Sequence, residues 1–439
     1  MGNLRPNALT LPDRASLVWT SLTKTIRQPE KNWPAQLCES PIITGCVRGR
    51  VIALIADPEA ARVILTGSES EFPKWRIYEK VVGAGMGREN LSASTGLRWR
   101  RQRQAFSLMF QPASASQAVP LFQAAVKQAI SAWGAADDIL VDAGLEMTRL
   151  ALGVVWRALF CAKPDADMPL FVTKAAEHIY RAHLRGDINE PAIKIRELAD
   201  AARDTAARPE TIGNNPFSTW PAIDGGPTDQ LSAQELYDNA RNFIAAGHET
   251  TALTLVWSLW LAAQDAETQN RIHREIDEVA GPDPIAEHHI DRLLFTGRVV
   301  KEAMRLYPPG FVTVRQARQP VRLAGELLPA DAILAVCIYA LHRHRDWWDE
   351  PDVFRPDRFA EAEPRHRYAY LPFSAGSHVC IGAAFAWREV IVVFASILQQ
   401  FRLSTDRAAT IYPRASITIR PNREVPITLH RRNRIRRGA

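Results

Sequence analysis

The sequence predicts a mainly α-helical protein with a small β portion. Long stretches of helical periodicity fill most of the chain, and the longest runs from Ser232 to Ala263. Runs rich in β-branched residues are short and gather around 41–55 and 321–338. The chain has 439 residues without an internal repeat, and single helical domains reach this length. We therefore expect residues 1–439 to form one domain.

The N-terminal part is expected to contain a hairpin, a helix and a long loop. Isoleucine and valine cluster around two glycines within 41–55, which indicates a β-hairpin. Asp57 followed by Pro58 is typical of a capped helix start, and this helix should extend to Leu65. The stretch 76–95 is rich in glycine and too long for a plain connection. Loops of that length are often functional.

Helices dominate the remainder of the chain. Ser232 and Glu235 have the spacing of a capping box, so the longest helix should begin there. The stretch 208–230 is rich in proline and is expected to form a loop within the domain. The other elements expected after residue 95 are helices at 98–110, 117–133, 138–160, 168–185, 190–207, 265–280, 291–307 and 383–401, with β segments near 321–328 and 332–338.

Composition limits the cellular setting and the partners. The chain has 5 cysteines without a C-x-x-C pair, which favours a reducing compartment and argues against disulfides or a zinc site. Because no 18 consecutive residues are apolar and prolines interrupt the N-terminus, we expect a cytoplasmic protein without a membrane anchor. The net charge of +6 comes mostly from a basic tail at about 430–439, which we expect to be solvated rather than bound to nucleic acid. We also expect no fused reductase domain.

One cysteine lies in a loop with the features of a ligand-binding site. Cys380 precedes the apolar helix 383–401, whose unpaired N–H groups would favour a thiolate. Phe373 can pack on a flat apolar cofactor, and Gly376 and Gly382 permit a tight loop near its face. The alternative is a buried free cysteine that begins a core helix, which is the commoner role of cytosolic cysteines.

The longest helix carries a second pattern, N-F-I-A-A-G-H-E-T-T at 242–251. Phe243, Ala246 and Thr250 recur at helical spacing and share a face. A flat ligand on that face would explain its small residues, and Glu249 beside Thr250 offers an acid and a hydroxyl for proton relay. A small-residue packing face with an exposed glutamate is an equally good interpretation.

Charged residues form two further patterns. Glu302 and Arg305 are neighbours on one helix face, either as a surface pair or as a buried pair with a third partner, Arg358. Trp99 and Arg103 lie one helical turn apart and are natural donors to carboxylates. A solvated basic helix is the alternative for this second pattern. Arg315 and His378 are further candidates to point inward, and His378 alone is a weak signal.

These patterns together resemble the cytochrome P-450 family of haem-thiolate monooxygenases, of the soluble bacterial type. The motifs F-x-x-G-x-H-x-C-x-G, A-G-x-E-T-T, E-x-x-R and P-x-R-F occur here in the family's order and at its separations, and the match covers nearly the whole chain. Two positions depart from the commonest pattern. Ser374 stands where glycine is usual, and His378 stands where arginine is more frequent.

The resemblance implies the cytochrome P-450 fold, with haem b buried between the long central helix and the cysteine-loop helix. Cys380 would be the thiolate ligand of the iron, and Glu249 and Thr250 would assist proton delivery. The structural triad would be Glu302, Arg305 and Arg358. The residues implied to hold the propionates or contact the haem are Trp99, Arg103, Arg315, His378, Phe373, Ala246 and Gly382. The expected substrate pocket comprises Phe243, Ala246, Val312 and Ile417.

The implied activity is insertion of one oxygen atom from dioxygen into a hydrophobic small molecule, by hydroxylation, epoxidation or dealkylation. Electrons would come from a separate acidic ferredoxin or flavodoxin with its NAD(P)H reductase, steered by the basic residues around 98–103, Arg365, Arg367 and Arg388. Two alternatives remain open, a peroxide-dependent peroxygenase and a haem-binding sensor without turnover. The intact Glu249-Thr250 pair argues against both. The substrate itself cannot be identified from the sequence.

Overall fold

The computed structural model describes residues 4–11, 29–76, 82–83, 85–160, 170–187, 189–206, 231–360, 366–406 and 410–432. Helices fill most of this part and strands are few, so the predicted mainly α class with a small β portion is confirmed. The expected loop at 208–230, Cys161, Arg365 and the end of the basic tail from residue 433 lie outside the described residues.

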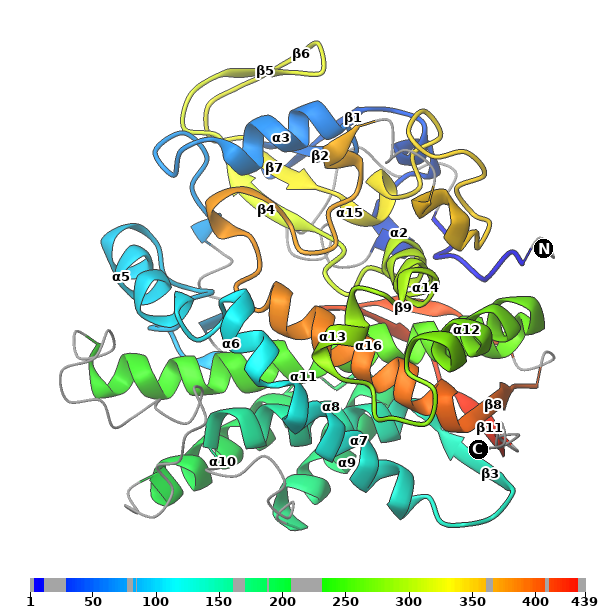
Figure 1. The fold of residues 1–439 in the computed structure, drawn as a ribbon. Helices are drawn as coiled ribbons and strands as arrows, with labels where there is room; N and C mark the ends of the chain where they lie inside the picture. The colour runs from blue at the N-terminus through cyan, green and yellow to red at the C-terminus, as the bar shows by residue number, and fades with distance from the viewer. Residues whose placement is uncertain are drawn as a thin grey trace.

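The long helix α11 (Ala233–Gln264) is the element around which the others pack. It contacts α8, α10, α12, α14 and α16. Helices α7–α10 lie toward one end of the molecule, low in Figure 1, and α16 crosses the centre in orange. The bounds of the longer helices are α3 Pro58–Thr66, α5 Gly96–Ser107, α6 Pro112–Gln117, α7 Val119–Ala132, α8 Ala143–Phe160, α9 Leu170–Arg185, α10 Asn189–Ala206, α12 Ala266–Val279, α14 Leu294–Leu306 and α16 Ala383–Gln400.

The largest sheet lies at the opposite end of the molecule, at the top of Figure 1. Its order is β1-β2-β7-β4, and only the β2–β7 pair is parallel. A second sheet has the order β3-β11-β8, and β9–β10 and β5–β6 are two-stranded. The strands are β1 Ile42–Val47, β2 Arg50–Ile55, β3 Asp138–Asp142, β4 Thr313–Gln316, β5 Val321–Leu323, β6 Glu326–Leu328, β7 Ile333–Val336, β8 Phe401–Ser404, β9 Pro413–Ala415, β10 Ile419–Pro421 and β11 Pro426–Arg431.

Short helical segments complete the connections. The short α-helices are α2 Pro29–Asn32, α13 Glu287–Ile290 and α15 Ile338–Leu341, and the 3-10 turns are η1 Ala35–Cys38, η3 Pro356–Phe359, η4 Arg367–Ala369 and η5 Gly376–His378. Within the described part of the chain, no helix is long and apolar enough to cross a membrane.

Local capping signals in the sequence predicted two helix starts well. The Asp57 side chain accepts a hydrogen bond from the N–H of Ala60 at the start of α3. Ser232 and Glu235 form the expected capping box of α11. Both predictions are confirmed because each cap is made by residues that are close in sequence.

Two boundaries differ from the prediction because distant partners determine them. Residues 138–142, predicted as helix, form strand β3, which pairs with β11 near the C-terminus. The predicted helix 291–307 begins only at Leu294. There the Glu275 carboxylate of α12 accepts hydrogen bonds from the N–H groups of Phe295 and Thr296 at 2.6 and 2.8 Å. A cap supplied by another helix leaves no local sequence signal.

Candidate active site

A cavity lies between α8 and α11 on one side and the cysteine loop with α16 on the other. Side chains from these elements, from α5 and from β4 line it. The expected site residues that line it are Trp99, Arg103, Phe243, Ala246, Thr250, Arg315, His378, Cys380 and Gly382. Four other expected site residues do not line the cavity, namely Glu249, Phe373, Val312 and Ile417.

The cysteine loop is held in a tight turn against α3. The N–H of Cys380 donates to the carbonyl of Phe373 at 3.0 Å, which closes the loop. Gly376 has a φ of 73°, and a Cβ there would lie 1.8 Å from the carbonyl oxygen of Leu65, so glycine is required. Ser374 has a φ of 62°, which explains why glycine is usual at this position. The loop thus presents the Cys380 sulfur to the cavity.

Burial raises the pKa of the Cys380 thiol, while a hydrogen bond from the Gly382 N–H and the charge of Arg103 oppose the rise. The cavity itself extends over Gly382, where an added Cβ would meet no atom within 4 Å. A flat group could therefore approach the backbone here, and Phe373 supports the loop rather than the cavity wall.

Cationic side chains gather at one end of the cavity. Arg103 donates to the carbonyl of Val379 at 2.9 Å. The His378 ring lies 4.1 Å, between centroids, from that of Trp99. Arg315 lines the same end. Burial and the charges of Lys74, Arg315 and Arg103 lower the pKa of His378 to about 3.

Lys74 is a member of this cluster that the sequence analysis missed. Its Nζ donates to the carbonyls of Leu91, Ser92 and Ser94 at 3.2, 3.0 and 2.9 Å. Burial, followed by the charge of Arg315, lowers the pKa of Lys74 to about 7. No motif marks this lysine, which reaches the cavity because residue 74 bridges to Arg315 beside the sheet.

These residues fit a haem. Among the described residues that line the cavity, only Glu389 has a carboxyl side chain, and burial raises its pKa well above the usual range. The lining residues therefore supply no ionised carboxylate near neutral pH to balance Lys74, Arg103 and Arg315. A flat apolar group with two carboxylates and a metal would fit all three features of the cavity. Its carboxylates would pair with the cations, its flat face would occupy the open space over Gly382, and its metal would bind the Cys380 thiolate.

The α11 face above the cysteine loop has small residues for two reasons. Ala246 and Gly247 line the cavity, as the flat-ligand interpretation requires. A Cβ on Gly247 would also lie 2.9 Å from Val155 of α8, so close helix packing contributes equally. Thr250 lines the cavity and its hydroxyl donates to the carbonyl of Ala246 at 2.7 Å.

Glu249 faces away from this cavity, which corrects the expectation that its carboxylate adjoins the ligand. It accepts a hydrogen bond from Thr418 at 2.5 Å and forms an ion pair with Arg420 of β10. Burial raises its pKa, but Arg420, His183, Thr418 and His248 together lower it to about 2. Glu249 is therefore ionised, in a separate small cavity that His183 and His248 also line.

Val312 and Ile417 are also corrected as pocket residues. Thr313 and Val314 line the cavity in place of Val312, which packs against the core. Ile417 is 46% exposed at the turn between β9 and β10, and its neighbour Thr418 points inward to Glu249. Sequence reasoning missed the wall that α8 supplies, which consists of Val155, Ala158 and Leu159. The apolar sequence of α8 predicts that the helix is almost completely buried. It does not predict that α8 forms one wall of the cavity.

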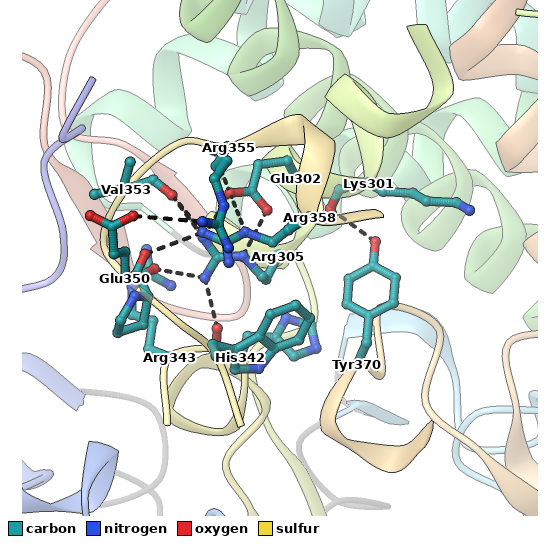
Figure 2. A network of polar contacts seen from close by, with 12 residues as sticks. Lys301, Glu302, Arg305, His342, Arg343, Glu350, Val353, Arg355, Arg358 and Tyr370 are labelled. Atoms are coloured by element: carbon teal, nitrogen blue, oxygen red, sulfur yellow. Dashed lines mark hydrogen bonds and ion pairs between the residues drawn. The ribbon is translucent and has the colours of Figure 1, made fainter. Parts of the chain in front are cut away.

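A closed network of buried charges lies behind the cysteine loop (Figure 2). Glu302 and Arg305 are both 0% exposed, and Arg305 donates to both carboxylate oxygens of Glu302, at 2.7 and 2.9 Å. Arg358 donates to the same carboxylate at 3.0 Å, as does the backbone N–H of Arg355 at 2.9 Å. Arg305 also donates to the carbonyls of His342 and Pro351, so the network fixes the coil that leads to the loop.

Known proteins resemble this chain over most of its length. The family model described as Cytochrome P450 matches residues 222–424. Taurochenodeoxycholic 6 alpha-hydroxylase of Sus scrofa is 26% identical, over 87% of this chain and 82% of that protein. Cyclooctatin synthase of Streptomyces melanosporofaciens is 28% identical over 86% of each chain. Cytochrome P450 4A10 of Rattus norvegicus is 38% identical over a shorter region, 40% of this chain and 35% of that protein.

The family model, these similarities and the helical fold agree with the sequence motifs. They confirm the predictions of the family, of the fold and of a haem-thiolate monooxygenase, an oxidoreductase. Residues 222–424 of this chain match the cytochrome P450 family, and relatives of that family align with most of the chain.

Proposed function

We propose that the cavity holds haem b, with the Cys380 sulfur as the ligand of its iron. The observation that carries this proposal is that Cys380 and the cationic side chains of Lys74, Arg103 and Arg315 line the same cavity. We assign the propionates to these cations with Trp99 and His378. The sequence has no C-x-x-C-H motif for covalent attachment, which supports the b type.

When bound, a haem held by the Cys380 thiolate would supply the oxidising chemistry, because electron donation from sulfur would favour the activation of dioxygen. The activity of the family is insertion of one oxygen atom from dioxygen into a hydrophobic molecule, with electrons from a redox partner. The protein itself has to bind and orient the substrate, exclude water from the cavity and guide the transfer of protons on the α11 side.

Thr250 and Glu249 are proposed to divide the control of protons. The Thr250 hydroxyl lines the cavity and can donate to a group bound there if it leaves the Ala246 carbonyl. Glu249 directly precedes Thr250 in the sequence, but its side chain points away from the cavity. Its carboxylate is ionised and pairs with Arg420. In this arrangement the ionised Glu249 holds its hydrogen-bond donors Thr418 and Arg420 outside the cavity, and Thr250 holds the hydrogen bonds within it.

The substrate is proposed to be a hydrophobic small molecule. Many of the side chains that line the cavity are apolar, including Phe110, Leu159, Phe243 and Val314. Burial of apolar surface would therefore drive binding. Two of the relatives carry hydroxylase or synthase in their names, and hydroxylation is the reaction that we propose here.

The proposed electron donor is an acidic ferredoxin or flavodoxin with its NAD(P)H reductase. Arg98, Arg100 and Arg367 are exposed and could steer it. Three of the arginines expected to take part have carboxylate partners, which reduces their contribution. Arg98 lies 3.7 Å from Glu89 and 3.7 Å from Glu235. Arg388 is paired with Glu287 at 3.0 Å, and Arg101 is paired with the buried Glu235.

We also propose that the enzyme works in the cytoplasm as the single domain expected from its length. The cysteines that the structure describes, Cys38, Cys46, Cys337 and Cys380, are all free thiols, which supports a reducing compartment. The first residues of the basic tail are part of the folded domain. Arg431 belongs to β11, and Arg432 forms an ion pair with Asp277 at 2.6 Å.

The test is a reconstitution. Haem-loaded protein, reduced under carbon monoxide, should show the red-shifted Soret band of a thiolate ligand. Apolar compounds should shift the spin state of the ferric protein, and a ferredoxin with its reductase should then support substrate-dependent NADH oxidation with oxygenated product. Turnover with hydrogen peroxide alone would favour the peroxygenase alternative, and binding without any turnover would favour the sensor.

A further inference from the structure

An asparagine in the wall of the cavity lacks a partner within the protein. Asn242 of α11 lines the cavity and is 2% exposed. Its Oδ1 is buried and accepts no hydrogen bond. Buried amide groups in proteins are nearly always hydrogen-bonded, since an unpaired one is costly.

A second asparagine on the same helix provides the comparison. Asn239, one turn earlier, is also buried, but its Oδ1 accepts from the N–H of Leu91 at 2.8 Å and its Nδ2 donates to the carbonyl of Glu235 at 2.8 Å. Asn239 therefore has a structural task, which is to hold the loop at residue 91 on α11. Asn242 has none of these bonds, although it lies in an equally buried place.

No side chain that lines the cavity donates a hydrogen bond to the Asn242 Oδ1, and several lining side chains are apolar. Phe243 is its neighbour in sequence, and Phe110, Val155 and Leu159 line the same cavity with purely apolar side chains. An apolar residue would fit this wall at lower cost. The polar amide is thus explained if the molecule that enters the cavity completes its hydrogen bonding.

We propose that Asn242 binds a hydroxyl group of the substrate, so that the substrates are largely apolar molecules that carry a hydroxyl at one end. This inference rests on the proposed function and narrows its substrate class. A hydroxyl both donates and accepts, so it satisfies the amide in either orientation of its oxygen and nitrogen. An apolar hydrocarbon of the same shape would leave the amide unpaired.

The position of Asn242 also fixes the orientation of the substrate. Asn242 precedes Thr250 by eight residues, which corresponds to about 12 Å along the helix axis. The hydroxyl would therefore be held far from the place where oxygen is activated, and the carbon that is oxidised lies at the opposite end of the molecule from the hydroxyl.

The experiment compares matched ligands in matched variants. Dissociation constants from the spin-state shift are measured for bicyclohexyl against 4-cyclohexylcyclohexanol and for n-decane against 1-decanol. The ratio of the alcohol's constant to the hydrocarbon's is expected to rise about five- to tenfold from wild type to Asn242→Leu, because the variant keeps the branched shape of the side chain and removes the hydrogen bond. In wild type, oxygenation of 4-cyclohexylcyclohexanol should fall on the ring without the hydroxyl, and in Asn242→Leu it should spread over both rings.

Leu159→Val serves as the control, since it changes the same cavity without changing its polarity. It should alter the affinity for both members of a pair alike. Asn242→Ala is measured beside Asn242→Leu, and the carbon monoxide spectrum shows whether each variant holds haem normally. An unchanged ratio in both variants would overturn the assignment, as would an alcohol whose hydroxyl binds the iron and shifts the spectrum in the opposite direction. Failure of wild type to bind any of the four compounds or to show the thiolate spectrum would instead count against the proposed function.

Discussion

Buried charges are arranged in opposite ways at two places in this molecule. Around Glu302, one carboxylate receives hydrogen bonds from Arg305, Arg358 and a backbone N–H. At the cavity, Lys74, Arg103 and Arg315 gather with His378, and the sole carboxyl side chain among the described lining residues is Glu389, whose pKa is raised by burial. The first cluster pairs its charges with one another, whereas the cavity of the second offers room for an anionic ligand beside its cations.

The difference separates structural charges from functional ones. Burial raises the pKa of Glu302, but its two arginines outweigh this effect and leave the pKa lowered, so the closed cluster keeps its charges. In the cavity cluster, burial and like charges lower the pKa values of both Lys74 and His378. Variants of the closed cluster should therefore impair folding, and variants of the cavity cluster should fold but handle the cofactor or the reaction differently.

The largest effect is expected for Glu302→Ala. Loss of the carboxylate leaves two buried guanidinium groups without their partner, which costs roughly 3–5 kcal/mol of unfolding free energy. Since that is a large part of the stability of a typical domain, little haem-loaded protein should accumulate. The measurements are the yield of soluble holoprotein and its urea unfolding midpoint.

The matched control is Glu59→Ala. Glu59 and Arg62 have the same spacing in the same E-A-x-R sequence, and their side chains are 55% and 44% exposed. Exposed pairs contribute about 0–1 kcal/mol, so this variant should behave like wild type. If both variants express and unfold alike, the closed cluster is not a folding element.

The second effect is a loss of the thiolate spectrum without loss of the fold. Cys380→Ser should remove the red-shifted Soret band of the reduced carbon monoxide complex, because an alcohol is a much weaker donor to iron than a thiolate. Cys38→Ser and Cys46→Ser should keep the band. A band that survives in Cys380→Ser and disappears in another cysteine variant would refute the ligand assignment.

The same two clusters show how far the sequence could predict the site. The resemblance to a known family led us to expect Cys380, Thr250 and Arg103 around one ligand, and all three line the same cavity. Spacing could not tell Glu302–Arg305 from Glu59–Arg62, since the two pairs differ only in what covers them. The resemblance to a known family resolved that ambiguity.

Other features depend on contacts between distant segments and left no local signal. Strand β3 exists because it pairs with β11, and the start of α14 depends on Glu275 of α12. Lys74 lies among the cations because its backbone bridges to Arg315. Glu249 points away from the cavity because it pairs with Arg420. Both partners lie far away in the sequence. The fold class and the cysteine loop were thus predictable, whereas the direction of individual side chains was not.

A smaller, pH-dependent effect is expected for Lys74→Met. In the haem-free protein, Lys74 loses its proton above about pH 7, whereas a lysine in the unfolded chain keeps it to about pH 10.4. The unfolded state binds more protons in this interval, so wild-type stability should rise with pH from about 7 to 10. The variant should lack this rise, and its haem should transfer to apomyoglobin a few times faster at pH 7 because a propionate loses a positive neighbour.

Lys301→Met is the control for the lysine variant, since Lys301 is exposed on α14. Urea unfolding of the haem-free proteins at pH 7 and pH 9 gives the comparison. Equal pH dependence in wild type and Lys74→Met would show that Lys74 keeps its charge without the cofactor, and the cavity cluster would then be complete without an anion.

The smallest structural change with a functional consequence is expected for Thr250→Ala, and α11 offers a close control. The hydroxyls of Thr250 and Thr254 each donate to the carbonyl four residues earlier, at 2.7 and 2.9 Å. Thr250 lines the cavity and Thr254 does not. Alanine is the better helix former by a few tenths of a kcal/mol, so neither variant should lose stability or haem.

The two variants should differ only in how electrons are used. With a ferredoxin and its reductase, Thr250→Ala should still oxidise NADH and bind substrate, but product formed per NADH should fall severalfold and hydrogen peroxide should rise to match, because the cavity has lost the hydroxyl that holds a proton near the reacting oxygen. Thr254→Ala should keep wild-type coupling, since it removes the same helix hydrogen bond outside the cavity. Equal coupling in both variants would exclude Thr250 from proton control and leave helix packing as the reason for its place on this face.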